Sequence, residues 1–139
     1  MKASRRLGPI ARVARQRERD AARQLGDTVR QVELEQKQLD DLFAYREQYI
    51  ANFQIAGKAG LSVVQLRDYQ LFLQRLEDVI TQQKKKVLAC HENCAQSQEN
   101  WRDKYGNSKM INKVVEKRRD IEDKEQNSRE QREQDDRAK

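Results

Sequence analysis

The sequence has few of the residues that interrupt helices, with one proline and five glycines among 139 residues. Alanine, glutamate, glutamine, lysine, leucine and arginine are abundant instead, and these side chains lose little rotamer freedom in a helix. Uninterrupted apolar runs are also missing, since no stretch approaches the roughly 18 successive apolar residues of a membrane span. We therefore expect an all-α, cytoplasmic chain with neither a signal peptide nor a transmembrane segment.

Residues that commonly form catalytic or metal sites are scarce, with two cysteines and one histidine. Cys90 and Cys94 lie one helical turn apart, which is a poor arrangement for a disulfide. Together with His91 they provide three zinc-ligand types, but no fourth ligand is apparent and both thiols occupy positions where small apolar residues fit. No phosphate-binding glycine loop, HExxH motif or nucleophile elbow occurs. We therefore expect a protein that is not an enzyme and that has no metal site and no cofactor.

One cluster of chain-breaking residues, Gly57-Lys58-Ala59-Gly60, interrupts the body of the chain. Ser62 and Gln65 follow directly with the spacing of a capping box, in which each side chain bonds the backbone amide of the other residue. We therefore expect a turn at residues 57–61 and a second helix that starts at about Ser62.

Seven-residue repeats of mostly apolar residues run on both sides of this turn. Before it they are Ala11, Glu18, Leu25, Val32, Leu39, Arg46 and Phe53, with Leu7, Ala14, Ala21, Thr28, Glu35, Leu42 and Tyr49. After it they are Leu66, Leu73, Ile80, Val87, Cys94, Trp101, Ser108 and Val115, with Tyr69, Leu76, Gln83, Cys90, Ser97, Lys104 and Ile111. Such repeats are the a and d positions of a coiled coil. They predict an antiparallel coiled-coil hairpin over residues 1–119, with helices at about 5–56 and 62–119.

A turn near residue 59 pairs residues whose numbers add to about 118. The expected pairs are Phe53 with Leu66, Leu42 with Leu76, Leu39 with Ile80, and Val32 with Val87. Near the termini, Ala14, Ala21 and Glu18 are expected to face Lys104, Ser97 and Trp101. Glu35 falls beside Gln83, and we interpret this polar layer as a device that specifies register. Residues 120–139 contain so few apolar side chains that we expect a frayed helix or a disordered tail.

Positive charge is concentrated near the open end of the expected hairpin. Residues 1–19 hold seven Lys/Arg and one acid, and residues 100–119 hold seven Lys/Arg and two acids, for about +11 together. The basic residues on which we focus are Arg5, Arg6, Arg12, Arg15, Arg102 and Lys104. They fit a solvated helical face or an acidic protein partner. Nucleic acid is a weaker alternative, because no aromatic residues interleave the arginines and acids interrupt the basic face.

A second apolar stripe flanks the seam in the half of the hairpin nearer the turn. Gln38, Tyr45, Phe72 and Val79 occupy g positions, and the expected register places Tyr45 opposite Phe72 and Gln38 opposite Val79. The edges of Leu42, Tyr49 and Leu76 extend this stripe. The aromatic rings could simply shield the seam, but an exposed aromatic patch more often marks a partner site.

Several residue placements resemble the FliJ family of bacterial flagellar type III export. They are Ala21-Ala22-x-x-Leu25-Gly26, Gln38-Leu39-x-x-Leu42-x-x-Tyr45-x-x-x-Tyr49, Tyr69-Gln70-x-Phe72-Leu73-x-x-Leu76-Glu77-x-x-Ile80-x-x-Gln83 and Trp101-Arg102-x-Lys104. The resemblance covers about residues 7–119 and implies a shape similar to the rotary stalk of F-type ATPases. It further implies insertion into a hexameric export ATPase, handling of export chaperones, and membrane contact only through the export gate protein FlhA. We expect the ATPase ring to bind the basic residues named above, Arg5, Arg6, Arg12, Arg15, Arg102 and Lys104.

In members of this family the gate-facing surface corresponds to Gln38, Leu42, Tyr45, Tyr49, Phe72, Leu76, Val79 and Gln83 of this chain. The resemblance therefore predicts a peripheral protein at the inner face of the cell membrane. The alternatives are a holdase-like secretion chaperone, the related stalk of a virulence type III system, and a basic coiled coil that binds nucleic acid.

Overall fold

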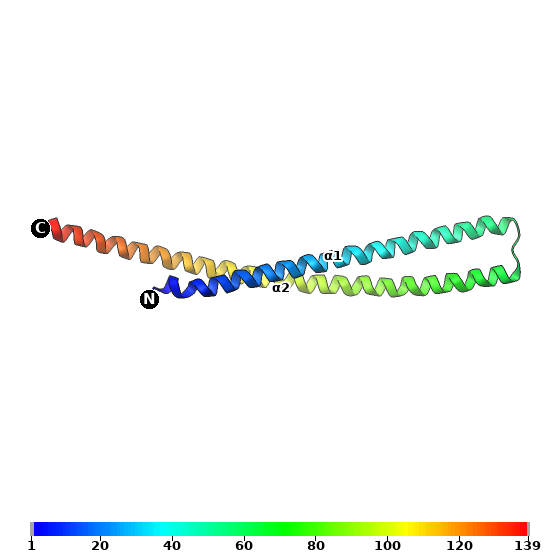
Figure 1. Ribbon diagram of the computed structural model, residues 1–139, viewed down its shortest axis with the longest axis horizontal. Helices are drawn as coiled ribbons and strands as arrows, with labels where there is room; N and C mark the ends of the chain where they lie inside the picture. Colours follow the sequence, from blue (N-terminus) through cyan, green and yellow to red (C-terminus); the bar gives the residue numbers. More distant parts are fainter. Residues whose placement is uncertain (1, 139) are drawn as a thin grey trace. The chain divides into compact units, whose positions relative to one another are not determined.

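The computed structural model describes residues 2–138, which form two α-helices and no strand (Figure 1). Helix α1 spans Ala3–Lys58 and helix α2 spans Val63–Ala138. The two helices pack against each other, which confirms the expected all-α hairpin. Neither helix contains, within the described residues, a segment long and apolar enough to cross a membrane.

The turn forms where the glycines and the capping box predict it. The Ser62 amide donates to the Gln65 Oε1 at 2.9 Å, and the Gln65 amide donates to the Ser62 Oγ at 3.1 Å. Gly60 has a φ of +92°, a left-handed conformation that glycine adopts without the clash of a Cβ atom. The capping box therefore starts α2 by satisfying amides that a helix N-terminus leaves without partners.

The chain divides into two compact units, which we describe separately. The turn unit is Gly26–Gln96, and it contains the end of α1, the turn and the start of α2. The terminal unit is Met1–Leu25 with Ser97–Lys139.

Burial follows the heptad pattern in both units. Twelve residues of the described chain are buried, and all of them occupy expected a or d positions. They are Ala11, Ala14, Ala21, Glu35, Leu39, Leu76, Ile80, Gln83, Val87, Ser97, Ser108 and Val115. Burial therefore follows the predicted seam, in which only Leu66 is exposed among the described residues, and the core is a single narrow stripe along each helix.

Apolar packing is densest in the turn unit. Leu39, Leu76, Ile80 and Val87 form one cluster, against which Leu42 and Phe43 pack. Ile80 is only 1% exposed, and burial of such a side chain stabilises the fold by about 1.5–3 kcal/mol.

Nearer the turn an aromatic pair joins the two helices, while the expected pairing of Phe53 with Leu66 stays a prediction. Phe53 stacks on Tyr69, with ring centroids 3.4 Å apart and an angle of 12° between the ring planes. Leu66 remains 43% exposed. Aromatic side chains bury a large apolar area, so this stack stabilises the end of the hairpin next to the turn.

The expected polar layer is present in the turn unit. The Gln83 Nε2 donates to the Glu35 backbone carbonyl at 2.9 Å and to the Glu35 Oε2 at 2.6 Å. The Gln31 Nε2 donates to the Glu35 Oε1 at 3.0 Å. Both carboxylate oxygens are thus hydrogen-bonded, as the burial of a charged group requires.

The terminal unit has a seam of small side chains, and its polar contacts join residues other than the seam pairs expected from the sequence. Its hydrogen-bonded pairs are Ser4 with Glu122 and Arg15 with Asn112, whose numbers add to 126 and 127 rather than about 118. Long side chains lean toward the N-terminus of their own helix, so polar contacts between antiparallel helices join residues with higher sums. Alanine and serine seam residues also specify register weakly, because they interlock less than large side chains.

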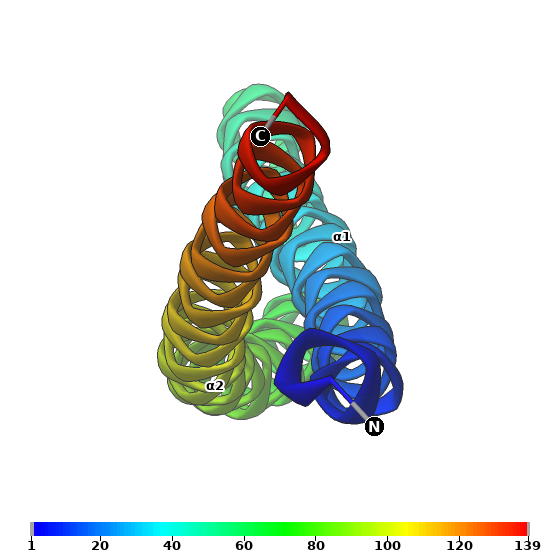
Figure 2. The same cartoon turned by 90° about the vertical axis from the view of Figure 1, so that its left-hand side faces the viewer.

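Helix α2 continues through residues 120–138, so of the two alternatives expected for this segment, a frayed helix or a disordered tail, the structure shows a helix. Figure 1 shows this last part of α2, orange to red, extending past the start of α1, and Figure 2 views the chain from that end. Strong helix formers dominate it, and side-chain pairs one turn apart, Gln126 with Glu130 and Gln131 with Asp135, are hydrogen-bonded. Local helix propensity therefore supports this part of α2, which contacts the start of α1 at Glu122.

Candidate partner-binding surfaces

The residues expected to form the gate-facing surface lie together in the turn unit. We call the set Gln38, Leu42, Tyr45, Tyr49, Phe72, Leu76, Val79 and Gln83 the aromatic strip. Tyr45 on α1 meets Phe72 on α2 edge to face, with ring centroids 6.2 Å apart and 66° between the planes. Tyr49 lies 4.5 Å from Phe72 and 6.4 Å from Tyr45, measured between centroids. These three rings form one cluster across the two helices.

Exposure differs among the residues of the aromatic strip. Tyr45, Phe72 and Val79 are 50%, 37% and 48% exposed, and Gln38 is also exposed. Leu76 and Gln83 are buried in the seam, while Leu42 and Tyr49 are half-buried. The accessible part of the strip therefore consists of its g positions. The Gln83 amide is already committed to Glu35, so its Nε2 is directed into the seam.

The aromatic cluster extends further toward the turn than the strip expected from the sequence. Tyr49 stacks on Tyr69 with centroids 5.2 Å apart and 8° between the planes, and Tyr69 in turn stacks on Phe53. Both residues were recognised as seam positions, but heptad spacing does not show that their rings join. The sequence did contain a signal for this aromatic cluster, because Tyr49, Phe53 and Tyr69 all lie within three helical turns of the glycines.

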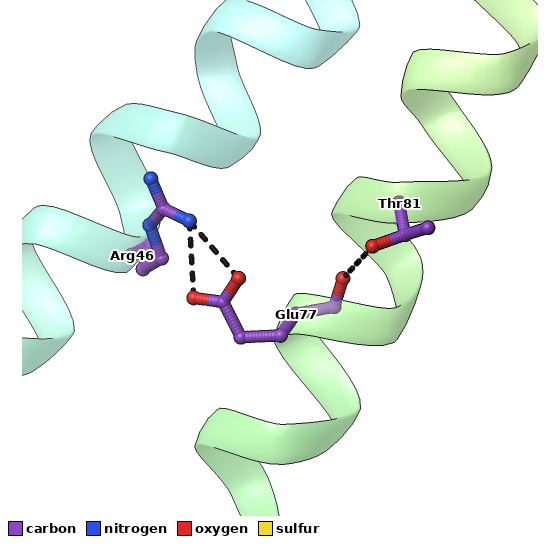
Figure 3. A network of polar contacts seen from close by, with 3 residues as sticks. All are labelled: Arg46, Glu77 and Thr81. Carbon is purple, nitrogen blue, oxygen red and sulfur yellow. Dashed lines mark hydrogen bonds and ion pairs between the residues drawn. The ribbon is translucent and has the colours of Figure 1, made fainter.

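The opposite flank of the same seam is closed by the chain's own charges. The Arg46 Nη1 donates to both carboxylate oxygens of Glu77 at 3.0 Å, and the Thr81 hydroxyl donates to the Glu77 carbonyl at 3.0 Å (Figure 3). The Arg46 guanidinium and the Lys84 ammonium lie 5.2 and 5.5 Å from the centroid of the Phe43 ring. Cation–π contacts therefore cover the Phe43 ring on this flank, and polar contacts lie beside it.

The basic residues singled out in the sequence all lie in the terminal unit. Arg5, Arg6, Arg12, Arg15 and Arg102 are exposed and Lys104 is half-buried; we call these six the basic cluster. The Arg15 Nη1 donates to the Asn112 Oδ1 at 3.2 Å, which fixes one guanidinium against α2. Arg12 and Arg15 line a hollow of about 340 Å³ together with Arg119. The concentration of positive charge makes this region attractive to anionic surfaces.

A hydrogen bond anchors the start of α1 to α2 in the terminal unit. The Ser4 hydroxyl donates to the Glu122 Oε2 at 2.5 Å, and the Ser4 amide donates to the Glu122 Oε1 at 3.2 Å. The Ser4 hydroxyl is the main cause that holds the pKa of the Glu122 carboxyl below its ordinary value, and the Lys2 charge adds to it. Hydrogen bonds to the ionised form favour that form.

The terminal unit also contains an apolar groove that the sequence did not reveal. Its volume is about 370 Å³. It is lined by Pro9, Ile10, Val13, Ala14, Arg17, Asn107 and Ile111. Ile10 and Val13 are about half exposed and lie outside the a and d positions. The available signal for this groove in the sequence was the pair Ile10 and Val13, two apolar residues three positions apart that lie off the seam.

The cysteine thiols of Cys90 and Cys94 are half-buried along the seam, where they fill space as small apolar groups. No group of three or more potential metal ligands occurs between residues 2 and 138.

Comparison with known proteins identifies the family. The sequence model described as "Flagellar FliJ protein" matches residues 2–139, which is almost the whole chain. No curated protein and no solved structure matches the chain significantly. The match extends past the part that the residue placements covered, into the end of α2. A two-helix hairpin with the aromatic strip and the basic cluster is therefore a member of the FliJ family, and the chain is a component of flagellar type III protein export.

Proposed function

We propose that this protein is a non-enzymatic stalk that links the hexameric export ATPase to the export gate protein FlhA. In this proposal the terminal unit binds the ATPase and the aromatic strip binds the gate, so the protein works in the cytoplasm, peripherally at the inner face of the membrane. The observation that carries the proposal is the unequal state of the two flanks of the turn-unit seam. One flank is closed by Arg46, Glu77 and Lys84, while the other presents Tyr45 and Phe72 to solvent.

The exposed rings suit a protein partner. Aromatic side chains bury a large area while they immobilise only two torsions, and they dominate many interfaces at about 2 kcal/mol or more each. Tyr45 and Phe72 hold each other edge to face, so little side-chain freedom remains to be lost on binding. Val79 and Gln38 add an apolar and a polar contact beside them.

The basic cluster suits the ATPase ring. Its clustered positive charge would steer the terminal unit toward an acidic pore or rim and accelerate association. The apolar groove beside Arg17 offers a place where the partner can bury apolar surface once the charges have brought it near. Export chaperones, whose binding the resemblance also implies, would use surfaces that these two sites leave accessible.

The gate-binding part of the proposal is tested with Tyr45→Ala and Phe72→Ala combined. We expect affinity for the cytosolic part of the gate protein to fall at least ~30-fold, since the loss of one anchor of about 2 kcal/mol already accounts for that factor. The matched control removes two exposed apolar side chains elsewhere, Tyr105→Ala with Leu88→Ala, and should bind normally. Titration calorimetry measures the affinities, and circular dichroism verifies helicity. Wild-type affinity in the folded double variant would refute the gate site.

The ATPase-binding part is tested by reversing four charges, Arg5, Arg6, Arg12 and Arg15, to glutamate. Association with the ATPase should slow and its dependence on salt should flatten, because electrostatic steering acts on the association rate. The matched control reverses four exposed bases of the turn unit, Arg67, Arg75, Lys85 and Lys86. Stopped-flow kinetics at several salt concentrations compare the two variants. Equal rates for both at low salt would contradict the assignment of the terminal unit to the ATPase.

A further inference from the structure

The segment around the turn is depleted of charge. Residues 48–66 contain one charged side chain, Lys58, although 37% of the whole chain is charged. No acid occurs between Glu47 and Asp68. A solvated hairpin turn is ordinarily polar, so nineteen residues with a single cation are not explained by solubility.

The apolar side chains of this segment project into solvent. Val63, Ile55 and Val64 are 83%, 68% and 67% exposed, and Val63 is the most exposed large apolar residue among those described. Leu66 adds a fourth exposed aliphatic side chain. None of them belongs to the core of the turn unit. We call residues 55–66, which carry these four side chains, the turn tip.

The backbone of the turn tip satisfies most of its own hydrogen bonds. The Ala59 and Gly60 amides donate to the Ala56 and Gly57 carbonyls at 3.2 and 3.1 Å. The capping box supplies partners for the amides of Ser62 and Gln65. A loop that enters an apolar medium must pair its amides internally, because each unpaired group costs several kcal/mol there. This turn meets that requirement at four amides.

The composition of the turn tip fits a lipid surface better than a protein pocket. Protein interfaces are anchored mainly by tyrosine, tryptophan and arginine, and the tip contains none of these. Insertion into a bilayer requires apolar side chains but no particular shape. The four aliphatic side chains at the end of the hairpin meet this requirement. Behind them lies the Phe53–Tyr69 stack, roughly 8 Å from Lys58 along the helix axis, and aromatic rings are enriched at that depth of the membrane interface.

Charge specifies the kind of lipid. The only charged side chains between Glu47 and Asp68 are Lys58 and Arg67, and both are cationic and exposed. A lysine at the tip can bury its aliphatic stem while its ammonium reaches phosphate oxygens. Each cation near an anionic membrane surface adds to the electrostatic attraction between the chain and the lipid.

We propose that the turn tip inserts shallowly into the interface of an anionic phospholipid bilayer. The contact is a direct one with lipid, in addition to the contact through the gate protein, and it does not depend on either binding site proposed above. Ile55, Val63 and Val64 enter the acyl boundary, while Lys58 and Arg67 pair with headgroup phosphates. This departs from the expectation that the chain meets the membrane only through the gate.

The sharpest test places a fluorescent reporter in the tip of the full-length chain. Val63→Trp is made in a Trp101→Phe background and mixed with vesicles of phosphatidylglycerol and phosphatidylethanolamine. We expect a blue-shifted emission that brominated lipids quench. The matched control is Leu88→Trp in the same background, because Leu88 is similarly exposed at 65% but lies outside the tip. Its emission should not change. Emission from position 63 that matches the control in vesicle-bound protein would overturn the proposal.

A second measurement separates the tip from the basic cluster, which also attracts anionic lipid. Vesicle co-sedimentation is performed in about 0.5 M salt, where interactions between exposed charges are largely screened. Val63→Ser with Val64→Ser should lower partitioning about tenfold or more, whereas Leu88→Ser should leave it unchanged. At low salt, Lys58→Gln should weaken binding to anionic vesicles and leave neutral vesicles unaffected. Absence of vesicle binding by the wild-type chain, or equal binding by the two serine variants, would refute insertion.

Discussion

Replacement of Gln83 by leucine should destabilise the turn unit because it removes one of the two hydrogen-bond donors to a buried carboxylate. The Gln83 Nε2 bonds the Glu35 Oε2 at 2.6 Å, and Glu35 is only 6% exposed. In Gln83→Leu the carboxylate keeps one donor, Gln31, and loses a hydrogen bond of the charged kind, which is worth about 1.5–3 kcal/mol. We expect the free energy of unfolding to fall by about 2–3 kcal/mol, measured by urea denaturation monitored by circular dichroism.

Combining Gln83→Leu with Glu35→Leu should restore that loss. The paired change leaves no buried polar group without a partner and places two leucines in a seam that is otherwise apolar. Stability at or above the wild-type value is expected, together with a looser register, because a polar layer disfavours slipped pairings. Spin labels at Asp40 and Lys85, both exposed in the turn unit, would report a broader distance distribution.

The double-mutant cycle makes this reasoning refutable. If Gln83→Leu were as stable as the wild type, the hydrogen bonds to Glu35 would contribute nothing to folding. If the destabilisation of the double variant equalled the sum of the values for the two single variants, the coupling energy would be zero and Glu35 and Gln83 would not act as a buried pair.

Three further predictions concern local structure. Gly60→Ala should destabilise the fold by about 1 kcal/mol because the φ of Gly60 is +92°. Gly57→Ala should stabilise it by about 0.5–1 kcal/mol, because the new Cβ makes only ordinary van der Waals contact and the unfolded chain loses freedom. Thermal melts measure both changes. A double-mutant cycle on Arg46 and Glu77, which are partly exposed, should return a coupling of about 0.5–1 kcal/mol that shrinks in high salt. Ser4→Ala should raise the pKa of Glu122 toward its ordinary value in an NMR titration. Since that pKa is depressed in the folded chain, its contribution to stability is present above the unfolded pKa and is lost as pH falls through the folded one.

The seam, the turn and the capping box could be predicted from the sequence because each depends on local spacing. Heptad positions determine which face of a helix is buried, and all twelve buried residues of the described chain follow them. The edge-to-face contact of Tyr45 with Phe72 was also predictable, because large apolar side chains in the turn unit determine its register.

Other features depend on contacts that spacing does not encode. The register of the terminal unit could not be read from Ala11, Ala14 and Ser108, since small residues pack in several registers. The Phe53–Tyr69 stack depends on the directions of two rings at the turn. The apolar groove arises from residues on two helices, Ile10 and Ile111 among them, that no local pattern connects.

The central claim is that one chain binds the ATPase and the gate protein through separate surfaces. Mass photometry of the purified ATPase, the cytosolic part of the gate protein and this chain tests it most directly. We expect the ATPase and the gate protein to be found in one complex only when the chain is present. With the Tyr45→Ala, Phe72→Ala variant, only a complex of the chain with the ATPase should remain. Displacement of the ATPase from the chain by the gate protein, with no ternary complex, would contradict the account.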